Sequence, residues 1–285
     1  MRLVMFRKGE GEPRPGLLEG EGVVDLAAGF ADAMAVIRAG AEAVRPQSES
    51  ANATIPLREV RLLAPIVTTR PIGRPGRIFC VGLNYRDHAV ESHMEIPKVP
   101  TIFMKLVSAV IGPEETVRIP AMTRQPDYEV ELAIVIGKAG RRIPAEQWEE
   151  HVFGYTILND VSARDVQLAT SQWTLGKSFD TFCPLGPAIV TKDEMGDPHR
   201  LDICLSIGDE VLQHSNTREL IFKAPELIAY ISSVTALEPG DIISTGTPAG
   251  VGLGRKPQRW LQPGETMVAE IEGIGVLRNP VAAGE

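Results

Sequence analysis

Several features that would assign a chain to a well-known class are scarce in this sequence. It has three cysteines in 285 residues (Cys80, Cys183 and Cys204), without the paired spacing that a zinc or redox site would use. Isolated thiols among apolar residues indicate reduced core cysteines, which predicts a cytoplasmic protein. The net charge of −8, with no run of lysine and arginine, argues against nucleic acid as a partner. No stretch approaches the roughly 20 apolar residues that cross a bilayer, so no membrane partner is expected.

Glycine and proline are abundant, by contrast, and the apolar runs are short. There are 27 glycines and 22 prolines, which predicts many strands joined by turns. The strand candidates do not alternate regularly with helices, and this argues against a doubly wound parallel sheet. Beyond residue 70, helices are expected only at 84–92, 162–171 and 225–234.

The beginning of the sequence is expected to form a small unit of its own. Strand candidates at 1–6 and 22–27 precede a segment, 30–44, whose apolar residues recur at helical spacing. The polar, Ser/Asn-rich stretch 46–53 is expected to be a linker, and 55–66 an extended segment. We therefore expect a small N-terminal domain over residues 1–70 and a main domain over 71–285.

Two glutamates in an apolar strand are the most informative feature of the sequence. Glu129 and Glu131 lie two apart in DYEVELAIVIG, so both carboxylates leave the same face of a strand. An exposed strand face carrying two acids is the simple alternative, but LAIVIG continues as an apolar run typical of a buried strand. Asp160 ends a second apolar run, GYTILND. Three such carboxylates would repel one another, and oxygen ligands suit Mg²⁺, Mn²⁺ or Ca²⁺, so the set predicts a metal site.

Two cationic residues lie close to these acids in the sequence. Lys177 stands between Trp173 and Phe179 in WTLGKSFD, which indicates partial burial and hence an acidic or anionic partner. A solvated surface lysine is the alternative. Arg164 follows Asp160 by four residues, one helical turn. It would steady a carboxylate of the protein or bind one from a substrate.

A histidine and a glutamate offer acid–base chemistry. His88 and Glu91 lie three apart in GLNYRDHAVES, on one helical face, where the carboxylate would raise the basicity of the imidazole and make a general base. A surface pair is the alternative. The next segment, SHMEIPKVPT, is typical of a loop over a site. Later, the turn STGTPAGVG is either a plain turn or a site whose amides and Thr247 hydroxyl bind a substrate carboxylate.

Taken in order, these segments resemble the fumarylacetoacetate hydrolase family. The resemblance covers roughly residues 77–279 and is carried by GLNYRDHAVE, PTIFMK, DYEVELAIVIGK, VFGYTILNDVSARDVQ, QWTLGKSFDTFCPLGPAIVT and LEPGDIISTGTPAGVG. It implies a β-rich α+β fold, a mixed β-sandwich roll around a Mg²⁺ or Mn²⁺ site, with a small N-terminal α/β domain. It also implies a homodimer.

The resemblance implies a role for each candidate residue. The metal ligands would be Glu129, Glu131 and Asp160. The catalytic residues would be His88 and Glu91, on a lid, together with Lys177. The substrate site would be lined by Lys105, Arg164, Gln167 and Thr247.

The implied substrate is a small 2-oxo acid, often with a second carbonyl two carbons away. The leading hypothesis is a metal-dependent hydrolase that cleaves the C–C bond of a 2,4-dioxo acid and releases pyruvate, in aromatic or sugar-acid breakdown. An acylpyruvate, a fumarylpyruvate or a diketo-deoxy sugar acid would fit. The same residues would serve a decarboxylase of an oxaloacetate-like diacid or a tautomerase, and the sequence does not separate these. A non-catalytic ligand-binding protein on this fold is the alternative of a different class.

Overall fold

The protein is described here by a computed structural model that covers residues 1–44, 54–66 and 76–284. It is a β-rich α+β protein built on mixed sheets, as the sequence predicted. In this part of the chain, no helix is both long enough and apolar enough to cross a membrane.

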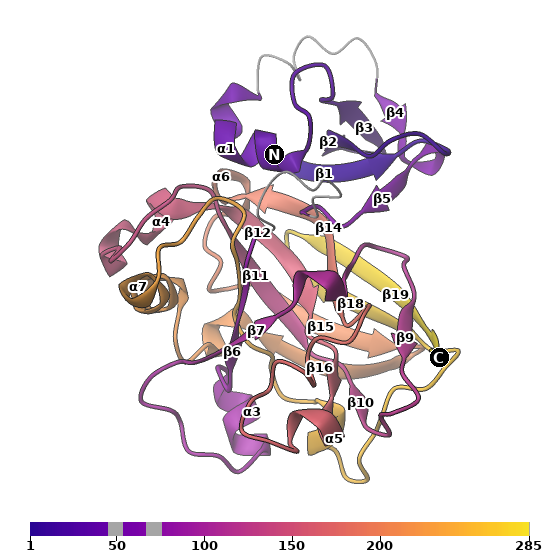
Figure 1. Cartoon of the computed structure of the whole chain (residues 1–285), viewed down its shortest axis with the longest axis vertical. Helices are drawn as coiled ribbons and strands as arrows, with labels where there is room; N and C mark the ends of the chain where they lie inside the picture. Colours follow the sequence, from indigo (N-terminus) through magenta and orange to yellow (C-terminus); the bar gives the residue numbers. More distant parts are fainter. Residues whose placement is uncertain (45–53, 67–75, 285) are drawn as a thin grey trace.

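A 12-stranded sheet runs through the whole molecule (Figure 1). Most neighbours in it are antiparallel, while β17 and β6 are parallel. Its strands in the main body, in spatial order, are β14 (Cys183–Thr191), β12 (Val152–Asn159), β11 (Val130–Ile136), β17 (Ile242–Ser244), β6 (Ile78–Gly82) and β7 (Thr101–Lys105). The short β8 (Val110–Ile111) pairs with β14.

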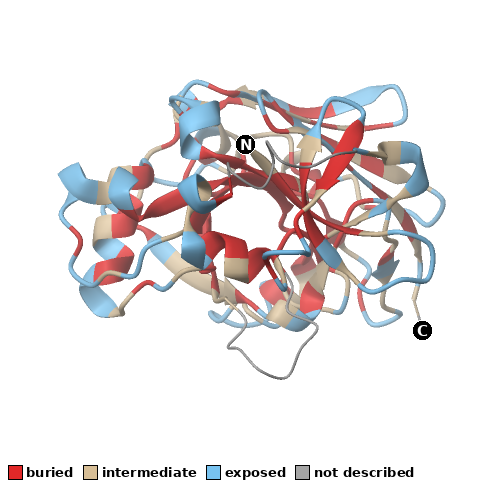
Figure 2. Cartoon of the chain, turned by 90° about the horizontal axis from the view of Figure 1, so that it is seen from above, coloured by how far each residue is buried: buried red, intermediate tan, exposed pale blue. Residues whose placement is uncertain are grey.

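The central strands are covered on both faces. Every residue of β11 and of β12 is buried, and Figure 2 shows buried ribbon through the middle of the molecule. Burial on both faces explains why VELAIVI reads as a continuous apolar run and not as an alternating one. The sequence placed both glutamates inside this strand. In the structure β11 begins at Val130, so Glu129 lies just before it.

A second, five-stranded sheet packs against the first. Its order is β16 (Glu210–Asn216), β15 (Asp202–Ile207), β18 (Thr266–Ile271), β19 (Gly275–Ala283) and β9 (Val117–Ile119). Leu205 and Ala269 of this sheet share one core with Leu132 and Ile157 of the large sheet. By its apolar pattern alone the run MVAEIEGIGVLRN, residues 267–279, would be one strand. It belongs to two, β18 and β19, because the chain reverses near Gly273, whose φ is +77°.

The first strands extend the large sheet. They are β1 (Arg2–Arg7), β2 (Arg14–Glu19), β3 (Gly22–Asp25), β4 (Ile55–Pro56) and β5 (Arg61–Leu63). β1 joins β14 through the pair Leu3 and Ile189. The expected linker 46–53 and the expected domain boundary near residue 70 lie outside the described residues.

Helices are short and flank the sheets. The predicted helix over 30–44 is only α1 (Ala33–Ala39), because Gly40 takes a φ of +84° and a 3₁₀ turn follows. α3 (Arg86–Glu91) and α5 (Arg164–Gln167) lie within the predicted helices 84–92 and 162–171, and α7 (Ala224–Val234) begins one residue before the predicted helix 225–234. The expectation of helices only at those three places was wrong, since α4 (Trp148–His151) and α6 (Lys192–Met195) also form; each has 4 residues, too few to show an apolar period in the sequence. α3 and α5 lie together at the lower end of the body in Figure 1, beside β10 (Pro126–Asp127), which pairs with β13 (Ser162–Ala163).

Candidate active site

Three carboxylates from two neighbouring strands meet in the interior. Glu129 precedes β11, Glu131 lies in it and Asp160 follows β12; the register of this antiparallel pair opposes Glu131 to Leu158. One oxygen from each carboxylate lies within 4.8 Å of the other two. All three residues are at most 5% exposed. The structure therefore brings together the three acids that the sequence nominated as metal ligands, and we call them the carboxylate cluster.

Three buried cations hold this cluster. Lys177 Nζ donates to Glu129 Oε2 at 2.6 Å and to Asp160 Oδ2 at 2.9 Å. Lys105 Nζ donates to Asp160 Oδ1 at 2.7 Å, and Arg164 Nη2 donates to Glu129 Oε1 at 2.5 Å. Charged partners on this scale are needed, because an unpaired carboxylate in the interior is very costly.

The two glutamates are in different electrostatic positions. Burial alone would raise the pKa of Glu129, but the charges of Arg164 and Lys177 outweigh it and lower that pKa to about 2. Burial raises the pKa of Glu131 well above its usual range, and the negative charges of Asp160 and Glu129 raise it further. Glu131 is thus the member of the cluster whose charge is least compensated.

The donor set fits a divalent cation. Glu131 accepts hydrogen bonds through Oε2, from Ser244 Oγ at 2.5 Å and from the Gly246 amide at 2.9 Å. A cation among the carboxylates would relieve the repulsion that raises the pKa of Glu131. The buried carboxylates also outnumber the three cations, which leaves negative charge that a divalent cation would balance. The four carboxylates are Asp127, Glu129, Glu131 and Asp160.

His88 and Glu91 form a bonded pair on α3, which we call the base dyad. His88 Nδ1 lies 3.0 Å from Glu91 Oε2, and the Gly250 amide donates to Glu91 Oε1 at 2.9 Å. Gly254 packs so closely that a Cβ there would lie 2.5 Å from Glu91 Cδ. If Nδ1 carries the proton donated to Glu91, the lone pair of Nε2 is free to accept another. The pair is therefore oriented as a general base.

One cavity joins the base dyad to the carboxylate cluster. It has a volume of 430 Å³, within the ordinary range for small-molecule sites. His88 and Glu91 line it together with Glu129, Glu131 and Lys177. Its apolar walls include Val81, Met94, Phe103, Leu168, Trp173 and Leu253. Such a cavity suits a small ligand with an anionic group at one end and a short apolar or polar chain at the other.

Of the four residues expected to line the substrate site, three line the cavity and one does not. Arg164, Gln167 and Thr247 line the cavity, whereas Lys105 does not: it is 1% exposed. The Arg164 fork also donates to Gln167 Oε1 at 3.0 Å. The hydroxyl of Thr247 donates to a backbone carbonyl of β11 and accepts from Gln213 Nε2 at 2.8 Å.

The turn over residues 244–252 differs from its expected use. The sequence left two alternatives, a plain turn or a site whose amides and Thr247 hydroxyl bind a substrate carboxylate. Instead, the amides of Gly246, Gly250 and Gly252 donate to three carboxylates of the protein itself. The turn therefore fixes the site's own acids, and Thr247 and Val251 are the residues of the turn that border the cavity.

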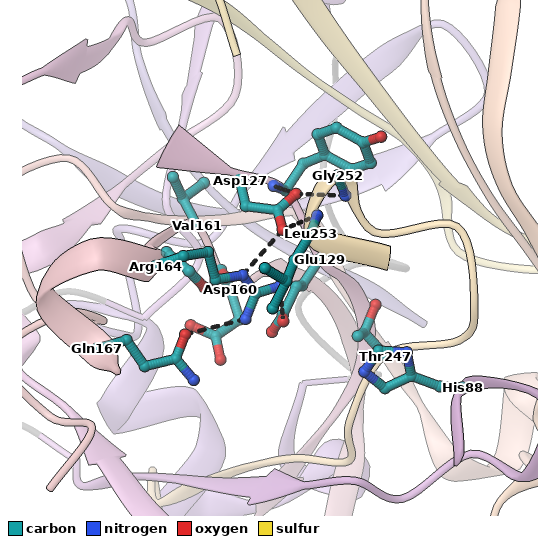
Figure 3. Close-up of polar contacts among 12 residues, drawn as sticks. His88, Asp127, Glu129, Asp160, Val161, Arg164, Gln167, Thr247, Gly252 and Leu253 are labelled. Carbon is teal, nitrogen blue, oxygen red and sulfur yellow. Dashed lines mark hydrogen bonds and ion pairs between the residues drawn. The ribbon is translucent and has the colours of Figure 1, made fainter. Parts of the chain in front are cut away.

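Asp127 is a residue of the site that the sequence reasoning missed. It is fully buried and accepts from Arg164 Nε at 2.8 Å, so that Arg164 lies between Asp127 and Glu129 (Figure 3). The signal was present, since Asp127 stands two residues before Glu129 just as Glu129 stands two before Glu131. The same alternation that paired the glutamates would have included it.

The matched family agrees with this geometry. Residues 77–282 match the family model described as Fumarylacetoacetate (FAA) hydrolase C-terminal. The chain belongs to the fumarylacetoacetate hydrolase family. The resemblance carried by the sequence motifs is confirmed, and the carboxylate cluster, the base dyad and the cavity all lie within the matched region.

Known members of the family carry out different reactions. The oxaloacetate tautomerase FAHD2A of cattle, a mitochondrial protein, is 49% identical over 229 residues, which are 80% of this chain and 71% of the relative. The fumarylacetoacetate hydrolase of Exiguobacterium antarcticum is 37% identical with a TM-score of 0.86, over 100% of both chains. The maleylpyruvate hydrolase of Sphingobium, solved with manganese(II) and pyruvate, is 34% identical with a TM-score of 0.83, also over 100% of both. The chain is thus an enzyme of this superfamily.

Proposed function

We propose that this enzyme is a divalent-metal-dependent tautomerase that interconverts the keto and enol forms of a 2-oxo diacid of the oxaloacetate type. The observation that carries the proposal is the base dyad across one cavity from the carboxylate cluster. Keto–enol exchange needs a group that moves a proton at carbon and a positive site for charge on oxygen. The sequence alone placed hydrolysis first. The identity with FAHD2A favours tautomerisation.

The base dyad supplies the proton transfer. His88 Nε2 would take a proton from C3 of the keto form, the carbon next to the 2-oxo group. The electron pair of that C–H bond moves to form the C2–C3 double bond, and the charge goes to the C2 oxygen. Protonation of that oxygen gives the enol, and the reverse sequence restores the ketone. Glu91, fixed by the Gly250 amide, stabilises the imidazolium that exists between the two proton transfers.

The carboxylate cluster and its cations supply the electrostatics. A divalent cation held by Glu129, Glu131 and Asp160, Mg²⁺ or Mn²⁺, would act as a Lewis acid that stabilises the enolate charge. Lys177 donates two of its three N–H groups to Glu129 and Asp160, which leaves one for an anionic oxygen in the cavity.

Two further side chains, a histidine and a lysine that can donate hydrogen bonds to an anion, favour a diacid over a substrate with a neutral tail. His93 and Lys256 both border the cavity. Within the described ranges, neither side chain has a hydrogen bond or an ion pair. Both are exposed, which leaves them free to bind a second carboxylate as it enters.

Hydrolysis of a 2,4-dioxo acid is the second candidate. The likeness to maleylpyruvate hydrolase favours it, and so does the same base dyad. In that reaction His88 would take a proton from water, and the hydroxide would attack the distal carbonyl. The C3–C4 bond would break to give an acid and a pyruvate enolate, and C3 would take the proton back from His88 to give pyruvate. Decarboxylation of a 2-oxo diacid would use the same site without the attacking water.

An assay with two substrates separates these reactions. The ultraviolet absorbance of the enol follows tautomerisation of oxaloacetate, and acetate release follows hydrolysis of acetylpyruvate, each with Mn²⁺ and against buffer alone. We expect rapid tautomerisation that falls by at least roughly 100-fold in His88→Gln. The exposed His214→Gln serves as the matched control. Acetate release without faster tautomerisation would move the function to hydrolysis, and pyruvate with CO₂ from oxaloacetate would move it to decarboxylation.

Two earlier expectations stay predictions. A homodimer is expected, and large apolar side chains are exposed at Val90, Leu168 and Leu175, between 56% and 75%. Light scattering on the purified protein tests this. A reducing compartment such as the cytoplasm is expected because the three cysteines are free and Cys80 and Cys183 are buried.

A further inference from the structure

Asp127 contacts both halves of the site. Its side chain is 0% exposed and accepts four hydrogen bonds. The donors are the Tyr128 amide at 2.9 Å, Arg164 Nε at 2.8 Å, the Gly252 amide at 2.7 Å and the Leu253 amide at 3.0 Å. One of these leads to the carboxylate cluster, and two lead to the loop that holds the base dyad.

The contact with Arg164 sets the position of Glu129. The guanidinium is a rigid planar fork, so fixing Nε fixes the direction of Nη2, which bonds Glu129 Oε1 at 2.5 Å (Figure 3). The backbone supports the arrangement, since Asp127 pairs with Ser162 between β10 and β13 and the Arg164 amide donates to the Gln125 carbonyl at 2.9 Å. Asp127 therefore orients a metal-binding carboxylate through one intermediate side chain.

The contacts with the loop set the position of Glu91. Asp127 binds two successive amides of the 3₁₀ turn η6 (Gly252–Gly254), and a Cβ at Gly252 would lie 2.7 Å from Asp127 Oδ1. The same short loop carries the Gly250 amide that bonds Glu91 Oε1, and Gly254, which packs on the Glu91 side chain. A loop docked on Asp127 thus holds Glu91 in line with His88.

We propose that Asp127 is the positioning residue that joins the two halves of the active site. It touches neither His88 nor the metal-binding atoms, and it acts on both through Arg164 and through the loop. The expected effect on turnover rests on the proposed role of the base dyad. The expected effects on metal binding and on the loop need no catalytic activity at all.

Asp127→Asn is the perturbation, because it keeps the size of the side chain and one acceptor oxygen. Whichever oxygen the amide nitrogen replaces, it faces one amide of the loop, Gly252 or Leu253, from which it cannot accept. The negative charge that pairs with Arg164 is lost in both orientations. Asp241→Asn is the matched control. Asp241 is also buried, also pairs with an arginine, Arg77, and also accepts four hydrogen bonds, but it lies just before β17, at the end of that strand away from Ser244.

Three measurements on the full chain test the proposal. Calorimetry with Mn²⁺ should show a Kd weaker by roughly 10- to 100-fold in Asp127→Asn, the usual effect of removing a partner of a metal ligand. Hydrogen exchange should be faster in the segment 250–254. With Mn²⁺ saturating, kcat should stay at least about tenfold lower while KM changes less, because metal restores Glu129 but not the loop. Asp241→Asn should match the wild type in all three.

Several outcomes would overturn the proposal. An unchanged Kd for Mn²⁺ would remove the link to Glu129, and unchanged exchange in 250–254 would remove the link to Glu91. Equal effects in Asp241→Asn would show general loosening instead. If Asp127→Asn does not fold, Arg164→Lys tests the effect on the metal site apart from the effect on the loop. It should weaken Mn²⁺ binding and leave hydrogen exchange in 250–254 unchanged. A wild type inactive on oxaloacetate would refute the proposed function, and the binding and exchange results would still stand.

Discussion

Replacing Lys177 by methionine tests the charge balance of the site. Methionine keeps most of the length and the apolar stem but removes the ammonium that bonds Glu129 Oε2 at 2.6 Å and Asp160 Oδ2 at 2.9 Å. Lys177 is 2% exposed, so the variant leaves two buried carboxylates without this partner. Breaking a buried ion pair costs about 3–5 kcal/mol. At about 2–4 °C per kcal/mol for a protein of this size, Tm in a chelator should fall by roughly 6–20 °C.

A divalent cation should reverse much of this loss. A ligand that binds only the folded state stabilises it by about 2.7 kcal/mol at 100 times its Kd and about 4.1 kcal/mol at 1,000 times. In Lys177→Met the Lys177 ammonium no longer competes for Glu129 and Asp160, and the net charge of the site is more negative by one. We therefore expect Mn²⁺ to raise the Tm of the variant by more than it raises that of the wild type.

Thermal unfolding in EDTA and in Mn²⁺ measures both effects. Lys138→Met is the control, because Lys138 and its partner Glu150 each have side chains 60% exposed, and such surface pairs contribute little. The control should melt with the wild type in both buffers. The reasoning would be refuted if Lys177→Met matched the wild type in EDTA, or if Mn²⁺ raised Tm equally in the two proteins.

Three further predictions concern the loop, the diacid and pH. Gly254→Ala should lower kcat by at least about tenfold without changing Tm, since the new Cβ would lie 2.5 Å from Glu91 Cδ and displace it; steady-state kinetics and melting check this. Lys256→Ala should raise KM for oxaloacetate by roughly tenfold and leave KM for acetylpyruvate unchanged, and the opposite pattern would exclude a diacid contact. Burial lowers the pKa of His199 below 6.5, so the unfolded chain takes up this proton first and stability falls as pH drops below about 6.5. His199→Gln should therefore lose less Tm between pH 7 and pH 5 than the wild type, while the exposed His214→Gln should not differ from it.

The parts of the site that follow from local spacing could be predicted from the sequence. Strand alternation placed Glu129 and Glu131 together, and helical spacing placed His88 beside Glu91. Each of these inferences needs only one element and its period. The β-rich fold likewise followed from short apolar runs between glycine and proline.

The partners of these residues could not be predicted, because they come from distant parts of the chain. The amide that fixes Glu91 belongs to Gly250, 159 residues away, and Lys105 reaches Asp160 across 55 residues. Nothing in the short segment around Lys105 marks it as wholly buried, since its burial is decided by the strands that cover it. The predicted length of the helix over 30–44 was wrong because the backbone conformation at Gly40, and not the apolar spacing, decides where α1 ends.

The pairing of β1 with β14 has a consequence for anyone who shortens this protein. The matched family region begins at residue 77, and a chain cut there would lose the strand that bonds β14 at Ile189 and Val190. The uncovered main-chain donors and acceptors would then form a template on which another molecule can add a strand. By covering this edge of β14, the N-terminal strands should oppose aggregation. The shortened enzyme should therefore precipitate at protein concentrations at which the full chain stays in solution.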